Sequence, residues 1–328
     1  QRESQIQKSQ NRTQEDQLPT QTQKKEMIEE VLEYNRRTSR KYGWKPSWFD
    51  CVGFDIELVT AVRAYQRFNK LKDDGMVGPG TFRRIFADRE KNIDDHLPLS
   101  EMSTGNKYIV HGSEFIPIEW EKVVLWSEDD GLEAQSGAYK RAPGRRNVAM
   151  FVNHWDVCLS SRACQRVLNN RGISVHFLID NDGTIYQTMD TQHIAYHAGS
   201  KGLNACTVGV EITNAYYLRH NKWYSKNGFG RRPIISDGKV NGAELEPFLD
   251  FYDIQKQALK ALWKACNKAM NIPLQTVLDD QGNMSTNTEH ISSSGNFRGI
   301  VHHYHLTNKK IDCAGLDIKK LLEEMDNG

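Results

Sequence analysis

The feature that most constrains the fold is an alternation of short apolar runs with helical segments in the second half of the chain. Residues 160–169 and 253–270 carry apolar side chains at helical spacing. Around them stand short β-rich runs, at 148–154, 174–179, 184–188, 208–213 and 299–303. Because strands and helices alternate, we predict an α/β fold with a mixed central sheet flanked by helices.

One local signal fixes how two of these strands connect. Asn181, Asp182 and Gly183 separate the runs at 174–179 and 184–188, and an Asp-Gly pair between β-rich runs is typical of a hairpin. Three further short strands are expected ahead of this region, at 108–111, 115–118 and 123–126.

The length of 328 residues exceeds what one compact core usually needs, so we predict two domains. Residues 1–24 are rich in Gln, Ser, Thr and charge, and we expect them to be a disordered tail. The predicted domains are a small helical domain over 25–90 and a larger domain over 108–328, joined by a polar linker over 91–107.

Two polar stretches, 216–247 and 279–296, interrupt the larger domain and are predicted to be surface insertions. The formal net charge of +1 gives no indication of a nucleic-acid partner. No apolar run reaches the roughly 18 residues that a membrane-spanning helix needs. We therefore expect no nucleic-acid partner and no membrane insertion. We also expect a monomer, although neither observation bears on the oligomeric state. No secretory signal is visible, and because the sequence begins with Gln1 the export route stays open.

The cysteines are scattered without a CxxC pair and resemble no disulfide framework. We expect most of them to be small buried apolar residues, with chemistry reserved for Cys313. The six are Cys51, Cys158, Cys164, Cys206, Cys266 and Cys313.

A candidate metal site arises where two predicted strands end. His154 closes the run 148–154, His303 closes the run 299–303, and Cys313 follows after a short basic loop. Zinc prefers imidazole nitrogen and thiolate sulfur, and a catalytic zinc keeps three protein ligands and one open position. A histidine that closes a strand is more often structural, so the spacing by itself only suggests this site.

Six ordered motifs resemble the type 2 N-acetylmuramoyl-L-alanine amidase family, which includes phage, bacterial cell-wall recycling and animal peptidoglycan recognition proteins. The resemblance covers roughly residues 145–325 and implies the amidase type 2 fold for the larger domain. In chain order the motifs are Asn153-His154-Trp155, the run 174–180 with 182–187, the run 195–199 with Asn204, the run 207–212, the run 301–304 and the run 313–317.

The N-terminal domain has a resemblance of its own. Asp55 is a plausible N-cap for a helix that carries Gln66, and Thr81 is a candidate cap for the next helix. A helix with a glutamine followed by DG-x-VG-x-x-T, here residues 74–81, resembles the peptidoglycan-binding type 1 domain. The resemblance covers residues 42–90 and implies attachment to the bacterial wall.

Carried over to this sequence, the amidase resemblance implies zinc ligands at His154, His303 and Cys313. His302 and His305 flank His303, but the family register favours His303, and alternation along a strand lets only one of two neighbours face the metal. Asp312 competes with Cys313, because some members use Asp as the third ligand. The Cys-x-Gly-Leu-Asp ending favours Cys313.

The resemblance also implies a catalytic role for Glu211 as the general base that activates the attacking water. Other members use a Tyr before the strand histidine, and here that position is Val175. His176, His197 and Asn204 are expected to bind substrate, with Asn204 alternatively holding the loop ahead of the Glu211 strand.

The oxyanion of the reaction is expected to be stabilised from the loop that precedes the third ligand. Members often place a Lys or Thr two residues before that ligand, which is Ile311 if Cys313 binds zinc and Lys310 if Asp312 does. Lys309 could also reach in.

The resemblance implies a zinc-dependent hydrolase that cuts the amide between N-acetylmuramic acid and L-alanine of bacterial peptidoglycan. We expect it to act on the cell wall, in the periplasm or outside the cell, as a bacteriolytic endolysin. The alternatives are a bacterial autolysin and a recognition protein that binds peptidoglycan without cutting it.

Overall fold

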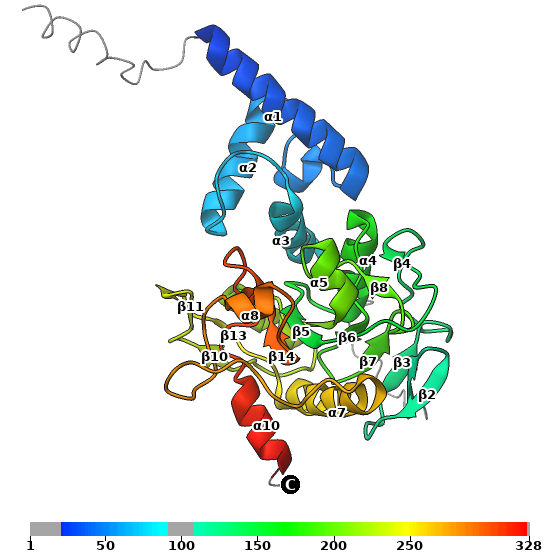
Figure 1. Ribbon diagram of the computed structural model, residues 1–328. Helices are drawn as coiled ribbons and strands as arrows, with labels where there is room; N and C mark the ends of the chain where they lie inside the picture. The colour runs from blue at the N-terminus through cyan, green and yellow to red at the C-terminus, as the bar shows by residue number, and fades with distance from the viewer. Residues whose placement is uncertain (1–20, 91–107, 327–328) are drawn as a thin grey trace, which may run out of the picture. The chain divides into compact units, whose positions relative to one another are not determined.

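The structure is a computed structural model that describes residues 21–90 and 108–326 (Figure 1). Most of the predicted tail and all of the predicted linker over 91–107 lie outside the described residues. The chain divides into two compact units, Gln1–Phe82 and Arg83–Gly328.

The N-terminal unit is helical, as predicted. Its first helix begins at Gln21 and so includes the last four residues of the predicted tail, 21–24. The elements are α1 (Gln21–Tyr42), the 3-10 helix η1 (Pro46–Phe49), α2 (Ile56–Phe68) and the start of α3 (Pro79–Arg89). The division between the units falls within α3, after Phe82.

Buried polar contacts explain why the DG-x-VG segment folds against α2. Asp55 caps α2 as predicted, accepting hydrogen bonds from the backbone N–H groups of Glu57 and Leu58. The amide of Gln66 in α2 donates to the Thr81 hydroxyl and accepts from the Gly75 N–H. Because α3 begins at Pro79, Thr81 lies inside the helix and serves this contact; its expected role as a cap is wrong.

The larger unit is built on a mixed sheet with strand order β14-β5-β9-β6-β7-β3. The β6–β7 pair is antiparallel, which confirms the Asp-Gly hairpin, and the other neighbours are parallel. The bounds are β3 (Val123–Leu125), β5 (Met150–Trp155), β6 (Phe177–Ile179), β7 (Ile185–Gln187), β9 (Thr207–Ile212) and β14 (Gly299–His302).

Smaller two-stranded pairs surround the sheet. They are formed by β1 (Tyr108–His111) with β2 (Glu114–Pro117), β4 (Tyr139–Lys140) with β8 (Ile194–Ala195), β10 (Ile234–Ile235) with β13 (Phe248–Leu249), and β11 (Lys239–Val240) with β12 (Ala243–Glu244). The helices are α4 (Ser161–Arg171), α5 (Lys201–Cys206), η4 (Leu218–His220), α6 (Asn221–Lys226), α7 (Asp253–Met270), α8 (His290–Ser293), α9 (His303–Leu306) and α10 (Ile318–Asp326).

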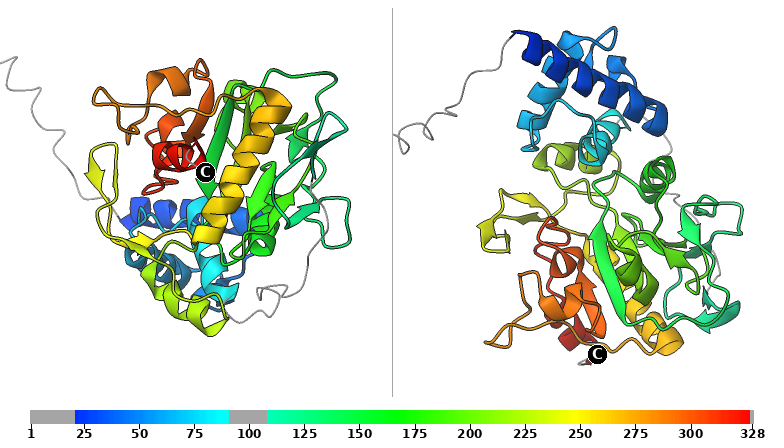
Figure 2. Two further views of the ribbon diagram at one scale, coloured as in Figure 1. Left: turned by 90° about the horizontal axis from the view of Figure 1, so that it is seen from below. Right: turned by 45° about the horizontal axis from the view of Figure 1, so that its top comes forward.

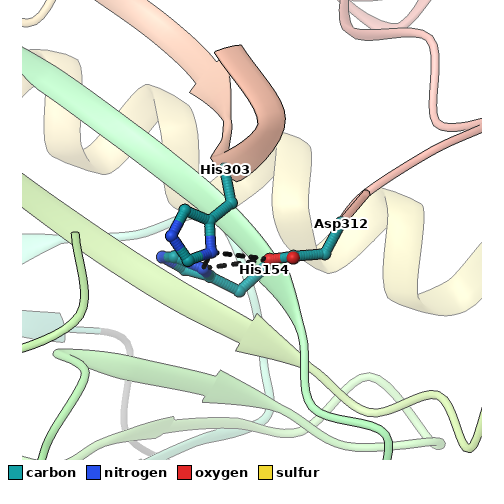
Figure 3. A group of neighbouring side chains, drawn as sticks. All are labelled: His154, His303 and Asp312. Atoms are coloured by element: carbon teal, nitrogen blue, oxygen red, sulfur yellow. Dashed lines mark hydrogen bonds and ion pairs between the residues drawn. The ribbon is translucent and has the colours of Figure 1, made fainter. Parts of the chain in front are cut away.

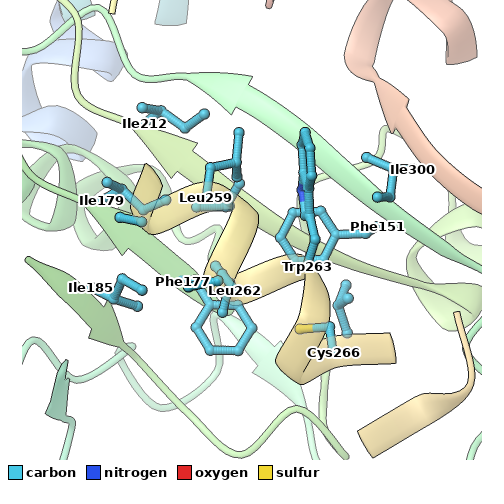
Figure 4. Packing of buried hydrophobic residues seen from close by; sticks show 14 of the residues in the cluster. Phe151, Phe177, Ile179, Ile185, Ile212, Leu259, Leu262, Trp263, Cys266 and Ile300 are labelled. Atoms are coloured by element: carbon cyan, nitrogen blue, oxygen red, sulfur yellow. The ribbon is translucent and has the colours of Figure 1, made fainter. Parts of the chain in front are cut away.

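The long helix α7 covers one face of the sheet (Figure 2). Its buried side chains, among them Leu259, Leu262 and Trp263, pack on strand residues such as Phe151 and Phe177 (Figure 4). Burying apolar area of this kind is the main stabilising term in folding. Since alternate residues of a strand point to opposite faces, the residues between these core positions face away from α7.

The predicted α/β fold is therefore confirmed, but the expectation for 216–247 is wrong in part. Trp223 and Tyr224 are buried beside Leu159 and Leu249, and Arg232 is buried between the rings of Tyr224 and Tyr252. A polar average composition concealed these buried side chains.

Among the described residues, no helix is both long enough and apolar enough to cross a membrane.

Candidate metal and catalytic site

Three parallel strands, β14, β5 and β9, lie side by side and bring their carboxyl ends to one edge of the sheet. His154 stands opposite Glu211 in the register of β5 and β9, so the two side chains project from the same face. His302 stands opposite Asn153, and His303, one residue further on, begins α9 with its ring beside that of His154. The topology thus gathers His154, His303 and Glu211.

Two of these histidines converge with a carboxylate (Figure 3). The Nδ1 atoms of His154 and His303 lie 3.0 Å apart, and Asp312 Oδ2 lies 3.2 Å from the first and 3.0 Å from the second. All three side chains are buried. Two imidazole nitrogens and one carboxylate oxygen form a donor set that zinc accepts, and three protein ligands leave a further position open.

The protonation states suit a metal. Burial, together with repulsion from His303, lowers the pKa of His154 to about 4, so its ring is neutral at pH 7. Burial disfavours the charge of Asp312, but attraction to His303 and the closeness of both imidazole rings outweigh this and hold the carboxyl pKa well below its usual range. Neutral imidazole and ionised carboxylate are the forms that bind metal ions.

Cys313, predicted as the third ligand, does not lie with the two histidines. Its side chain is fully buried in the hydrophobic core, and burial raises the pKa of its thiol well above the usual value. Asp312 occupies the position beside the rings. The two adjacent side chains face different surroundings, and the geometry favours the competitor, Asp312.

The other two histidines near His303 make backbone contacts elsewhere. His302 Nε2 lies 2.7 Å from the carbonyl oxygen of Leu316, and His305 Nε2 lies 2.7 Å from that of Ser285. Both rings are fully buried, which suits structural roles. The position of His303 beside His154 and Asp312 is consistent with the prediction that His303 is the ligand, in preference to His302 and His305.

The site opens into a cavity of about 600 Å³, large enough for part of a glycopeptide. Its lining includes His154, His197, Asn204, Glu211, His303 and Lys310.

The carboxyl group of Glu211 faces this cavity, and its pKa is raised. It is 8% exposed, and its Oε2 makes no hydrogen bond within the described part of the chain. Burial is the largest cause that raises its pKa, to about 8. A carboxyl with a pKa near neutrality can both accept and return a proton, which is the property required of a general base.

The three residues expected to bind substrate divide into two groups. His197 and Asn204 line the cavity, and Asn204 Oδ1 accepts from the backbone N–H groups of His197 and Ala198 at 3.1 and 2.7 Å. His176 is fully buried, and its Nδ1 accepts from the Gly209 N–H. Its packing within the sheet gives it a structural position, contrary to the expectation that it lines the cleft.

Lys310 and Lys309 both line the cavity. Burial lowers the pKa of Lys310, in spite of its attraction to Asp312. With Asp312 beside the histidines, Lys310 stands two residues before it, the position from which the family resemblance expects the oxyanion to be stabilised.

Thr207 and Gly209 were missed at the level of sequence. They alternate with Glu211 along β9 and therefore share the face that carries the site. Thr207 Oγ1 lies 3.1 Å from Nε2 of His197, whose ring packs directly over Gly209. The period-2 alternation back from Glu211 was a signal that could have found them.

The raised pKa of Glu211 predicts how its removal changes stability. The pKa is about 8 in the folded protein, against 4.5 as the ordinary value, so the folded state holds a proton that the unfolded chain releases between these values. This contribution to stability is complete below pH 4.5 and is lost as the pH rises toward 8. One pKa unit corresponds to about 1.4 kcal/mol. In the metal-free state, the free energy of unfolding of Glu211→Gln should therefore be several kcal/mol higher than that of the wild type at pH 8 and equal to it at pH 4.

Urea unfolding of both metal-free proteins across this pH range measures the difference. Burial raises the pKa of Asp156 to about 7, but Asp156 titrates in both proteins and its contribution cancels. Parallel stability curves for the two proteins would contradict the assignment.

Comparison with family models gives two matches. The N-acetylmuramoyl-L-alanine amidase model matches residues 144–312, just over half of the chain. The model of a putative peptidoglycan binding domain matches residues 49–85. No curated protein matches the chain.

Several solved structures are similar at low identity. The endolysin amidase LysCS from Clostridium intestinale is 15% identical, over 62% of this chain and 95% of its own, with a TM-score of 0.36. AmpDh3 from Pseudomonas aeruginosa, solved with anhydromuramic pentapeptide, is 19% identical over 58% and 64%, with a TM-score of 0.35. The Ph2119 endolysin of a Thermus scotoductus bacteriophage is 14% identical over 62% and 98%, with a TM-score of 0.33.

The chain belongs to the N-acetylmuramoyl-L-alanine amidase family, and it carries a peptidoglycan-binding domain ahead of its amidase domain.

Proposed function

We propose that this protein is a zinc-dependent peptidoglycan amidase that hydrolyses the amide between the lactyl group of N-acetylmuramic acid and L-alanine. The observation that carries the proposal is the convergence of His154, His303 and Asp312 beside Glu211 in one cavity. The proposed ligands are these two histidines and Asp312, in place of Cys313. When bound there, zinc would supply Lewis acidity, which lowers the pKa of water and polarises a carbonyl.

The protein's own groups would handle the proton and the developing charge. Glu211 accepts a proton from the attacking water and returns it to the amide nitrogen that leaves as the amine of L-alanine. Lys310 donates an N–H to the carbonyl oxygen as that atom gains negative charge. His197 and Asn204 line the same cavity, where they would contact the substrate.

The N-terminal domain would hold the enzyme on its substrate. A tethered catalytic domain meets a raised local concentration of peptidoglycan strands, so the second binding event becomes intramolecular. With a wall-binding and an amidase domain in one chain, we propose a bacteriolytic endolysin that acts on the cell wall as a monomer. A bacterial autolysin would have the same chemistry.

Metal removal tests the proposal. Chelation is expected to lower, at least ten-fold, the rate at which new L-alanine amino termini appear in purified peptidoglycan, because the three proposed ligands would lose their ion. Added zinc should restore it. Mass spectrometry of the products should find intact glycan strands and stem peptides that begin with L-alanine.

Two results would contradict the proposal. Full cleavage after verified metal removal would exclude the metal mechanism. Binding of peptidoglycan without cleavage by the zinc-loaded protein would favour the alternative, a recognition protein.

A further inference from the structure

A short chain of hydrogen bonds ends on the side of His154 that faces away from Asp312. Thr207 Oγ1 lies 2.8 Å from the carbonyl oxygen of Leu203 and 3.1 Å from Nε2 of His197. His197 Nδ1 lies in turn 3.0 Å from Nε2 of His154. The chain therefore connects a helix carbonyl in α5 with a ring that faces the metal site.

The protons along this chain can be counted. The Leu203 carbonyl can only accept, so the single hydroxyl hydrogen of Thr207 is donated to it. Thr207 Oγ1 must then accept from Nε2–H of His197. Within the described part of the chain, the ring of His197 has hydrogen-bond contacts with Thr207 and His154 and with no carboxylate, so we take this buried ring as neutral. A neutral imidazole has one N–H, so His197 Nδ1 accepts and His154 donates from Nε2.

We propose that Thr207 and His197 are positioning residues that hold His154 in the tautomer with Nε2–H, which leaves the Nδ1 lone pair directed at His303 and Asp312. The proposal deepens the proposed function, on which it rests for the identity of the metal. It assigns roles to side chains that are not among the proposed metal ligands.

This chain of hydrogen bonds disfavours the tautomer of His154 that carries its proton on Nδ1. In the metal-free protein Asp312 Oδ2 lies 3.2 Å from His154 Nδ1, so a proton on Nδ1 would gain a hydrogen bond to the carboxylate. That tautomer must lose its proton from Nδ1 before it can bind a metal. An acceptor at His197 Nδ1 favours the other tautomer and should therefore raise metal affinity.

The ring of His197 is also held in place sterically. A Cβ atom added at Gly209 would lie 2.6 Å from both Cε1 and Nδ1 of this ring, so the ring occupies the space that a side chain would need. Asn204 fixes the backbone of the same residue by accepting from its N–H. The lack of a side chain at Gly209 therefore helps to keep the His197 ring in the position from which it contacts His154.

The test compares Thr207→Val with Thr207→Ser in the full chain. Val keeps the shape but removes the hydroxyl, so zinc affinity, measured by competition with a chromogenic chelator, should fall about ten-fold or more. Ser keeps the hydroxyl and should bind zinc within about two-fold of the wild type. Gly209→Ala, which leaves Thr207 intact but displaces the His197 ring, should reproduce the effect of Val.

Thr213→Val is the matched control. Thr213 is also fully buried just beyond β9, and its hydroxyl donates to Asp156 outside the site. This variant should lose stability without losing zinc affinity. If Thr207→Val keeps the affinity of the wild type, or if Thr213→Val loses as much, the positioning role is wrong.

A direct measurement needs no variant. Long-range ¹H–¹⁵N spectra of the metal-free wild type distinguish the two imidazole tautomers, and both His154 and His197 should carry their proton on Nε2. A proton on Nδ1 of either ring would overturn the proposal. Because these spectra need neither zinc nor substrate, they test the chain even if the wild type binds no zinc or cuts no peptidoglycan.

Discussion

Glu211→Gln is expected to lower the rate of amide hydrolysis about 10²- to 10⁴-fold while zinc remains bound, because the amide side chain cannot accept the proton of the attacking water. The side chain stands opposite His154 in the sheet and faces the cavity without a hydrogen bond at Oε2 in the described part of the chain. Measurement of kcat on purified muropeptides, together with zinc content, gives the two quantities separately.

Asp156→Asn controls for the loss of any buried carboxylate. Asp156 is fully buried and its pKa is also raised, to about 7, but it accepts hydrogen bonds from the backbone of Cys158 and Asn214 and is absent from the cavity lining. Its substitution should cost stability and leave kcat near the wild-type value. Retention of full kcat by Glu211→Gln would remove Glu211 from the mechanism.

The sheet could be predicted from the sequence because its signals are local. The Asp-Gly hairpin and the helix over 253–270 each appear where periodicity and turn chemistry placed them. His154 and Glu211 were proposed as site residues from the family resemblance, and alternation along β5 and β9 explains why the two side chains share a face.

The expectations that differ from the observed geometry lie where regular periodicity ends. Asp312 and Cys313 follow the short helix α9 in a segment without strand or helix assignment, so no period indicates which of the two neighbours faces His154 and His303. His176 illustrates a different limit. A buried histidine that accepts from a backbone N–H has the same local sequence pattern as one that faces a cleft.

The identity of the third ligand gives the second large effect. Asp312→Ala should lower zinc affinity by several orders of magnitude and abolish hydrolysis. The substitution removes an anionic ligand whose Oδ2 lies within 3.2 Å of Nδ1 in both His154 and His303. Isothermal titration of the metal-free protein with zinc, with activity measured on the same samples, provides both readouts.

Cys313→Ser is the matched control, because it alters the adjacent residue and the ligand that the family motif favoured. The Cys313 side chain packs in the hydrophobic core, so the change should lower the free energy of unfolding by placing a hydroxyl among apolar groups. Zinc stoichiometry and kcat should stay close to the wild type. The reverse pattern, with zinc lost in Cys313→Ser and kept in Asp312→Ala, would require this loop to turn over on metal binding and would restore Cys313 as the third ligand.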